Sequence, residues 1–202
     1  MEPGKTLRRG KVLGITGSPG TGKKTLAPLV AARLGLPFSS VEELAASYGL
    51  AWRDAPRGEV DTSALRKRFS KDPPAPTLIY GHLLPFVLPK SSVSRVAVLR
   101  CEPSKLKARL LARGYSFPKV KENVEAELIG LVSSDSFRAF GGLHTCEYDT
   151  TQSEPPAAAR AIAEMLRGPK VAGPRIDWIL DYDYASKLSL LLSAHKSESA
   201  PT

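Results

Sequence analysis

The sequence contains little cysteine and no long hydrophobic run. Its 202 residues include only two cysteines, Cys101 and Cys146, too few for a disulfide framework or a four-ligand zinc site. No apolar stretch reaches the roughly 18 residues that a membrane-spanning helix needs. The apolar run that follows the basic segment at residues 1–10 is too short for a secretory signal. These absences predict a cytoplasmic protein with reduced thiols and no membrane partner.

Acidic residues are scarce relative to basic ones. The chain has 29 lysines and arginines against 20 aspartates and glutamates, which gives a net charge of +9. Between residues 100 and 123 only Glu102 and Glu122 accompany a run of basic residues: Arg100, Lys105, Lys107, Arg109, Arg113, Lys119 and Lys121. Such a segment favours a polyphosphate or RNA partner. The alternative is a solvated helix face with no partner.

Apolar runs and turn residues divide the chain into alternating strands and helices. Strands are expected at residues 11–16, 77–80, 93–100 and 143–148, and helices at residues 25–34, 41–48, 62–69, 103–113, 118–132 and 157–167. Loops are expected at residues 51–61 and 71–76, a last amphipathic helix at 176–192 and a frayed tail at 197–202. The length fits one domain. Strands that alternate with helices predict an α/β three-layer fold with a central parallel sheet.

A glycine-rich segment, Gly17-Ser18-Pro19-Gly20-Thr21-Gly22-Lys23-Lys24-Thr25, lies between the first expected strand and the first helix. The Gly17-x-x-x-x-Gly22-Lys23 spacing is that of a phosphate-binding P-loop. Glycines allow backbone amides to surround an anion, and the helix that follows directs its positive dipole end toward the same anion. Lys23 is expected to reach the β- and γ-phosphates of a nucleotide. The segment therefore predicts a site for nucleotide phosphate.

Two positions depart from the usual chemistry of such a site. The residue after the P-loop lysine normally supplies a hydroxyl ligand to Mg²⁺, but here it is Lys24, whose ammonium repels the ion. Thr25 is the candidate metal ligand in its place. Lys24 could instead replace part of the charge of Mg²⁺, or point outward and leave the ion with more water. The second strand ends in Tyr80-Gly81-His82, without the Asp or Glu that would complete the metal shell.

His82 follows the second strand at the place where its side chain is expected to face the phosphates. A histidine in that position can transfer a proton or position a water molecule. The alternative is a histidine with a structural role only.

Four stretches of sequence share the pattern of one family. They are G-S-P-G-T-G-K-K-T at residues 17–25, Y-G-H at 80–82, V-A-V-L-R-C-E-P at 96–103 and R-G-Y-S-x-x-K-x-x-E-N-V-x-A-E at 113–127. Together they resemble the archaeal and eukaryotic nuclear-type adenylate kinases, which are nucleoside monophosphate (NMP) kinases and ATPases linked to maturation of the small ribosomal subunit. The resemblance covers residues 11–168, and Arg175-Ile176-Asp177-Trp178 is similar to a short motif near the end of archaeal members.

This resemblance implies a role for each residue of the site. The P-loop residues expected to bind ATP are Gly17, Gly20, Thr21, Gly22, Lys23, Lys24 and Thr25. Arg113 falls on an arginine that contacts ATP, and Arg109 is suited, with Lys119, to clamp charge on the transferring phosphoryl group. His82 falls on the histidine of the family's catalytic motif. Lys23, His82 and Arg113 are thus the expected catalytic residues.

The same resemblance implies a division of the chain and a set of partners. A P-loop, NMP-kinase-like domain is expected at residues 11–168, with an NMP-binding segment at about 40–63 and a short lid at about 112–122. A flexible basic segment at residues 1–10 precedes it, and a C-terminal extension at 169–202 follows it. The implied partners are AMP or another NMP, a small-subunit ribosomal protein and rRNA, with the chain a monomer or weak dimer.

The chain also departs from the family at four positions. Lys24 stands where threonine is usual and Tyr80 where Asp or Glu is usual, so both changes affect the Mg²⁺ site. Ala46 replaces a basic residue of the NMP-binding segment. Glu154 stands near the adenine loop, where lysine is common.

Two main functions fit these observations. The first is an adenylate kinase that converts ATP and AMP to ADP, with ATPase activity, in small-subunit maturation. The second is a nucleotide-binding ribosome assembly factor with weak or absent phosphoryl transfer, and a kinase for another small-molecule acceptor is a third. Two acidic groups could contact the basic tail of a ribosomal protein, one formed by Glu122, Glu125 and Glu127 and the other by Asp177, Asp181 and Asp183. Salt-bridged helix faces are the alternative.

Overall fold

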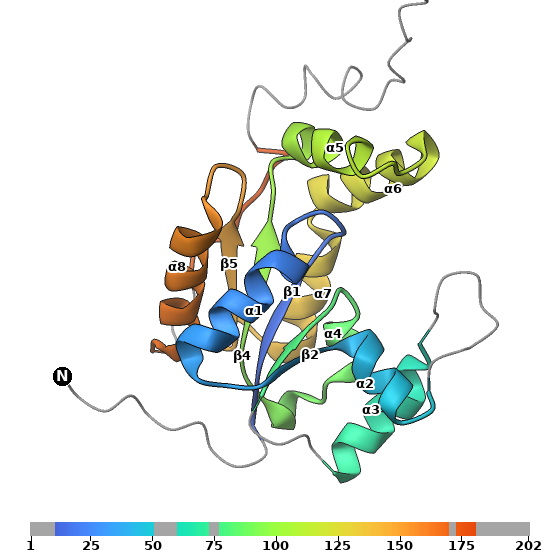
Figure 1. The fold of residues 1–202 in the computed structure, drawn as a ribbon, viewed down its shortest axis with the longest axis vertical. Helices are drawn as coiled ribbons and strands as arrows, with labels where there is room; N and C mark the ends of the chain where they lie inside the picture. The colour runs from blue at the N-terminus through green and yellow to red at the C-terminus, as the bar shows by residue number, and fades with distance from the viewer. Residues whose placement is uncertain (1–10, 51–59, 73–76, 170–172, 181–202) are drawn as a thin grey trace, which may run out of the picture.

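Five parallel strands form one sheet in the computed structural model, which describes residues 11–50, 60–72, 77–169 and 173–180. The strand order across the sheet is β2-β3-β1-β4-β5, as Figure 1 shows. The strands are β1 (Val12–Gly17), β2 (Phe38–Ser40), β3 (Leu78–Tyr80), β4 (Val93–Arg100) and β5 (Thr145–Asp149). The predicted α/β fold with a central parallel sheet is confirmed.

Helices cover both faces of the sheet. On one face lie α1 (Lys23–Leu34) and α8 (Pro155–Arg167), which pack against each other. The other face carries α2 (Val41–Ser47), α3 (Thr62–Lys71), α4 (Leu84–Val87), the short 3-10 helix η1 (Lys90–Ser92) and α7 (Leu131–Phe140). The pair α5 (Pro103–Leu111) and α6 (Phe117–Leu128) extends beyond the end of β4 (Figure 1).

The alternation of side chains along β1 explains why both layers have a core. Leu13 and Ile15 pack with α1 and α8, whereas Val12 packs with residues of α2, α3, α4 and α7. Successive strand residues point to opposite faces of a sheet, so a strand that is apolar at every position can be buried on both sides. All six residues of β1 are buried. The sequence pattern of β1 therefore requires the three-layer arrangement.

The register of the sheet brings two loops to one edge. β1 pairs with β3 on one side and with β4 on the other, with Gly14 opposite Ile79 and Val96. Parallel strands have their carboxyl ends on the same edge, where ligands of such sheets usually bind. The glycine-rich segment after β1 and the Tyr80-Gly81-His82 segment after β3 are consequently neighbours.

Most expected elements form within a few residues of the predicted bounds, but four described elements, namely β2, α4, η1 and α7, were not predicted. The expected single helix at residues 118–132 is two helices, because Gly130 adopts a left-handed φ of 63° that ends α6 and precedes α7. The three-residue strand β2 and the one-turn helix α4 carry too short a pattern to be recognised. The expected loop at residues 51–61 lies mostly outside the described residues, as do residues 1–10 and the tail at 197–202.

Two further expectations need correction. Glu127 is buried, so it does not contribute to an exposed acidic group with Glu122 and Glu125. The expected helix at residues 176–192 is not helical in its described part, where residues 178–180 form a turn capped by Asp177; the remainder lies outside the described residues. Among the described helices, none is long and apolar enough to cross a membrane.

Candidate nucleotide-binding site

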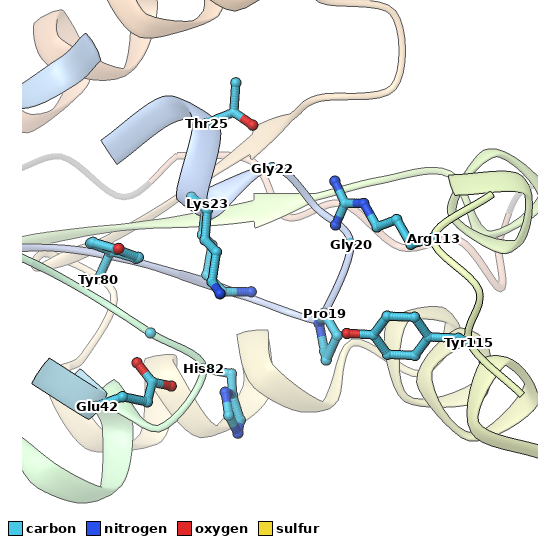
Figure 2. Close-up of a pocket in the computed structure, with 12 residues that line it drawn as sticks. Pro19, Gly20, Gly22, Lys23, Thr25, Glu42, Tyr80, His82, Arg113 and Tyr115 are labelled. Atoms are coloured by element: carbon cyan, nitrogen blue, oxygen red, sulfur yellow. The ribbon is translucent and has the colours of Figure 1, made fainter. Parts of the chain in front are cut away.

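A cavity of about 490 Å³ opens at the carboxyl edge of the sheet. Its walls come from the β1–α1 loop, the start of α2, the end of β3 and the link between α5 and α6, as Figure 2 shows. The lining residues are Pro19, Gly20, Gly22, Lys23, Lys24, Thr25, Glu42, Tyr80, Gly81, His82, Arg113 and Tyr115. The fold thus brings together most of the predicted site residues, including the three expected catalytic ones.

The backbone of the β1–α1 loop forms one wall of the cavity. Gly17 and Gly20 have φ values of 141° and 91°, and a Cβ on Gly17 would lie 2.4 Å from the Leu99 carbonyl oxygen. Only glycine fits such positions without strain. At the start of α1, the N-cap Gly22 makes no side-chain cap and the first turn contains no acidic residue. The amides of this helix end are therefore available to an anion, which the helix dipole also favours.

Lys23 occupies the middle of the cavity in Figure 2, with its side chain directed away from α1. Its Nζ donates hydrogen bonds to the carbonyl oxygens of Gly17 at 2.7 Å and Ser18 at 2.9 Å. Burial lowers the pKa of Lys23 to about 8, and the carboxylates of Glu127 and Glu42 oppose that decrease. The group is mainly a cation at neutral pH, held close to where phosphate oxygens would bind.

The opposite wall carries Glu42, Tyr80 and His82. Partial burial, followed by the nearby Lys23 ammonium, lowers the pKa of His82 below its ordinary value. Its imidazole is therefore neutral at pH 7 and able to accept or donate a proton. Burial, followed by the Glu43 and Glu42 carboxylates, raises the pKa of the Tyr80 phenol. Tyr80 is consequently a neutral hydrogen-bonding group here and no substitute for a carboxylate.

Sequence reasoning missed Glu42, and it also missed Pro19, Gly81 and Tyr115 among the lining residues. Glu42 lies in the first turn of α2, two residues after the N-cap Ser40, whose hydroxyl accepts a hydrogen bond from the Glu43 amide at 3.0 Å. The Glu43 carboxylate caps the Ser40 amide in return, so Glu43 is occupied and Glu42 faces the cavity (Figure 2). The capping-box pattern Ser-x-x-Glu was the available signal. It could have placed Glu42 at the carboxyl edge had β2 been recognised.

The two predicted arginines occupy different places. Arg113, in the link between α5 and α6, lines the cavity together with Tyr115. Arg109 does not line it; its guanidinium donates to the Thr150 carbonyl oxygen at 2.8 Å and to the Cys101 sulfur at 3.2 Å. The Thr150 hydroxyl in turn donates to the Thr21 carbonyl oxygen at 3.0 Å. Arg109 therefore braces the loop behind the glycine-rich segment.

The remaining predicted residues of the glycine-rich segment divide into two groups. Gly17 and Thr21 do not line the cavity, and the Thr21 hydroxyl donates to the Ser18 carbonyl oxygen at 2.9 Å, within its own loop. Lys24 and Thr25 are exposed and line it. In Figure 2 the Thr25 side chain lies on the side of Lys23 away from Glu42 and His82. Lys119 is paired with Glu122 at 2.7 Å.

Comparisons with known proteins agree with this arrangement. The AAA domain family matches residues 13–130. A protein of Thermococcus onnurineus named "Putative adenylate kinase" is 34% identical over 85% of this chain and 93% of its own length. Another of the same name, from Methanothermobacter thermautotrophicus, is 36% identical over 79% of this chain and 92% of its own length. This chain belongs to that adenylate kinase family.

Solved structures show the same fold at greater distance. A shikimate kinase from Bacteroides thetaiotaomicron has a TM-score of 0.56 at 14% identity, over 78% of this chain and 99% of its own. A second shikimate kinase, from Acinetobacter baumannii in complex with shikimate, has a TM-score of 0.53 at 20% identity, over 77% of this chain and 92% of its own. The adenylate kinase family member described here thus has the fold of P-loop kinases.

The donor groups of the cavity allow a test of whether Mg²⁺ fits this family member. In the described part of the chain, no three His, Cys, Asp or Glu residues are grouped to hold a metal ion. Mg²⁺ needs less than that, because one or two carboxylates usually hold it together with substrate phosphates and water. Glu42 is the one carboxylate among the described residues that line the cavity. The donor set therefore fits an ion that is shared with nucleotide phosphates.

Proposed function

We propose that this chain is a nucleoside monophosphate kinase that transfers the γ-phosphoryl group of ATP to AMP, with ATPase activity as a side reaction. The observation that carries the proposal is the single cavity in which Lys23, His82 and Arg113 meet at an uncapped helix N-terminus. Family membership supports the adenylate kinase assignment, because the relatives bear that name. The acceptor AMP and the role in the ribosome are the finer parts of the proposal.

In this proposal, positioning and charge neutralisation do most of the catalytic work. The amides of the glycine-rich segment and of the first turn of α1 hold the phosphates of ATP. Lys23 exchanges its two carbonyl acceptors for phosphate oxygens, and Arg113 neutralises charge from the side of the lid. His82, neutral at pH 7, positions the attacking phosphate or a water molecule by a hydrogen bond.

Glu42 is the residue that would hold a Mg²⁺ ion on the acceptor side of Lys23. When bound, the ion would supply positive charge that offsets the charge of the phosphates. Lys24 contributes a second cation from the exposed rim of the cavity. The Thr25 hydroxyl, predicted as a metal ligand, stays a prediction.

A second function is favoured by Lys24 and Tyr80, the two residues that replace the usual metal ligands of the family. Lys24 and Tyr80 line the cavity where a hydroxyl ligand and a carboxylate would serve the metal ion. A chain of this kind could bind nucleotide without turning it over at a useful rate. It would then act as an assembly factor of the small ribosomal subunit that binds a ribosomal protein and rRNA, for which the basic residues of α5 and α6 provide charge.

The experiment that separates the two functions measures conversion of ATP and AMP to ADP by the purified chain, with and without Mg²⁺. The wild type is compared with Lys23→Met, which removes the phosphate-binding cation, and with the double variant Lys24→Thr, Tyr80→Asp. ADP formation by the wild type, lost in Lys23→Met, supports the kinase. ATP binding without turnover, with turnover appearing only in the double variant, supports the assembly factor. No ATP binding by the wild type contradicts both.

The ribosomal role needs its own test. The acidic group of α6 is a weaker candidate than expected, because Glu122 and Glu125 are paired with Lys119 and Lys121 and Glu127 is buried. In the second group, Asp181 and Asp183 lie outside the described residues. Binding to a small-subunit ribosomal protein with a basic tail is measured by pull-down at moderate salt for the wild type and for Glu125→Lys with Asp181→Lys. Weaker binding of the double variant supports this contact. Unchanged binding excludes it.

A further inference from the structure

Glu127, near the end of α6, accepts hydrogen bonds from four residues in three separate parts of the chain. Its carboxylate accepts from the Ser18 hydroxyl at 2.6 Å and from the Arg100 Nε at 2.8 Å. It also accepts from the Cys101 amide at 3.1 Å and from the Trp178 indole Nε1 at 3.2 Å. The side chain is 2% exposed. A buried carboxylate with this many donors is fixed in position, because losing any of them leaves a charge less well solvated.

Through Ser18, Glu127 reaches the phosphate-binding loop. The Ser18 carbonyl oxygen accepts hydrogen bonds from Lys23 Nζ at 2.9 Å and from the Thr21 hydroxyl at 2.9 Å. The orientation of the Ser18 residue therefore determines where these two groups of the loop lie. Because Glu127 holds the Ser18 side chain, the position of α6 affects the position of Lys23 through Ser18. Glu127 itself does not line the cavity.

The other side of Glu127 is covered by the segment at residues 175–178, which is distant in sequence. The Ile176 carbonyl oxygen accepts from Arg100 Nη1 at 2.8 Å, and the Ile176 amide donates to the Glu147 carboxylate. The Arg100 guanidinium lies 5.8 Å from the centre of the Trp178 ring. The segment is thus docked on the same ion-pair group that holds the phosphate-binding loop.

We propose that Glu127 is a positioning residue for Lys23 and that docking of the segment at residues 175–178 on Glu127 is coupled to phosphate binding. This proposal rests on the proposed binding of nucleotide and adds the segment that regulates it. Coupling of this kind is reciprocal: if docking strengthens ATP binding, ATP binding strengthens docking by the same factor.

The first experiment removes single hydrogen bonds and leaves every charge in place. Ser18→Ala removes the hydroxyl between Glu127 and the loop, and Trp178→Phe removes the indole donor while keeping a ring. ATP without Mg²⁺ is the probe, and its affinity is measured by calorimetry. Each variant should bind ATP about three- to tenfold more weakly, which corresponds to the net contribution of one hydrogen bond. Ser70→Ala, an exposed serine inside α3, is the matched serine control and should bind ATP as the wild type does.

The second experiment follows the segment itself. In the Trp52→Phe background the indole fluorescence comes from Trp178 alone, since the chain has two tryptophans. Addition of ATP should change this emission and should slow hydrogen exchange of the amides at residues 175–178. The emission change should be lost in Ser18→Ala, because that variant cuts the connection between the loop and Glu127.

The third experiment distinguishes positioning from a general structural role. Charged or titratable groups face Lys23 from α6, α2, the lid, α1 and the end of β3, namely Glu127, Glu42, Arg113, Lys24 and His82. Glu127→Gln removes the carboxylate that most opposes the lowered pKa of Lys23. The decline of ATP affinity at alkaline pH should therefore begin at a lower pH in this variant. Glu147→Gln, which alters the other partner of Arg100, should leave that pH profile unchanged.

The outcomes separate this proposal from the function on which it rests. If the wild type binds no ATP, the proposed function fails. If the wild type binds ATP but Ser18→Ala and Trp178→Phe bind it within twofold as well, with no response of the Trp178 emission, the coupling is wrong. If Glu127→Gln does not fold, Ser18→Ala and Trp178→Phe, which change no charged residue, still test the coupling. Equal pH profiles of the wild type and a folded Glu127→Gln would exclude positioning of Lys23 by Glu127.

Discussion

Lys23 links the charge of the cavity to the backbone of its own loop. Its pKa of about 8 places the loss of its proton just above neutral pH. ATP affinity should therefore be nearly constant from pH 7 downward to the point where other groups titrate, and should fall as the pH rises through 8. A single required proton gives a decline of up to about tenfold per pH unit. Calorimetric titrations between pH 7 and 10 measure this profile.

Two controls identify the titrating group. Lys23→Met should bind ATP weakly at every pH in this range, with a flat profile. Lys24→Met should bind more weakly than the wild type but keep the decline near pH 8, because Lys24 is exposed on the rim. A wild-type profile that stays level to pH 10 would contradict the role given to Lys23.

The second prediction concerns Glu42 and Tyr80 and the effect of Mg²⁺ on ATP affinity. β2 and β3 are paired with Ser40 opposite Tyr80. Residues 42 and 80 therefore lie close together at the carboxyl edge of the sheet, and a carboxylate at either position can face the same cavity. Glu42→Gln should reduce the gain in ATP affinity that Mg²⁺ produces by about three- to tenfold, the effect of one charge-assisted contact. Adding Tyr80→Asp to Glu42→Gln should restore that gain. ATP affinities with Mg²⁺ and with a chelator measure it.

The matched control is Glu122→Gln, an exposed carboxylate of α6 outside the lining of the cavity. It should leave the Mg²⁺ effect unchanged. A full Mg²⁺ effect in Glu42→Gln would mean that phosphates and Lys24 alone determine how the ion is bound.

At the scale of elements, α2 depends on its first turn. Ser40 and Glu43 form a complete capping box, with the Glu43 carboxylate 2.7 Å from the Ser40 amide. Ser40→Ala should lower the free energy of unfolding by about 1 kcal/mol, the usual effect of removing such a cap. Urea unfolding measures the change. Ser70→Ala, an exposed serine inside α3, should change stability by less than about 0.5 kcal/mol, and an equal effect of the two would exclude capping as the cause.

The elements also show what the sequence could and could not predict. The buried strand at residues 93–100 was predicted with its observed bounds, because it contains the continuous apolar run at 96–99 and is followed by Pro103. β2 was missed because Ser39 and Ser40 carry no apolar pattern and the strand exists only through its pairing with β3. The break at Gly130 was missed because apolar spacing continues from α6 into α7.

The candidate site, like the fold, was predicted only in part from the sequence. The P-loop spacing predicted Lys23 and the family resemblance assigned His82 and Arg113 to the same site, and all three line one cavity. Arg109 was grouped with Arg113 and Lys119 as a cation suited to clamp charge on the transferring phosphoryl group. The structure separates Arg109 from Arg113, because α5 ends at Leu111 and the chain then turns toward the cavity. Arg109 was misplaced because its guanidinium binds Thr150, 41 residues away, and no local pattern shows such a partner.

At the scale of the whole molecule, one buried ion-pair group joins β4, β5 and α6. Arg100 Nε lies 2.8 Å from Glu127 and Arg100 Nη1 lies 2.7 Å from Glu147, with all three side chains nearly inaccessible. Its members are 27 and 47 residues apart, so no local pattern could reveal it. Sequence reasoning assigned Arg100 to a basic surface segment and Glu127 to an acidic surface, and burial overturns both.

Removing one member of this group should therefore be far more costly than removing an exposed pair. Arg100→Ala leaves two carboxylates buried without their cation, which should lower the free energy of unfolding by about 3–5 kcal/mol. Arg138→Ala breaks the exposed pair with Asp135 at 3.1 Å and should cost less than about 1 kcal/mol. Urea unfolding of both variants at pH 7 measures the difference. Equal costs would mean that the strands and α6 are joined by their apolar contacts alone, and that Arg100 only fills space between them.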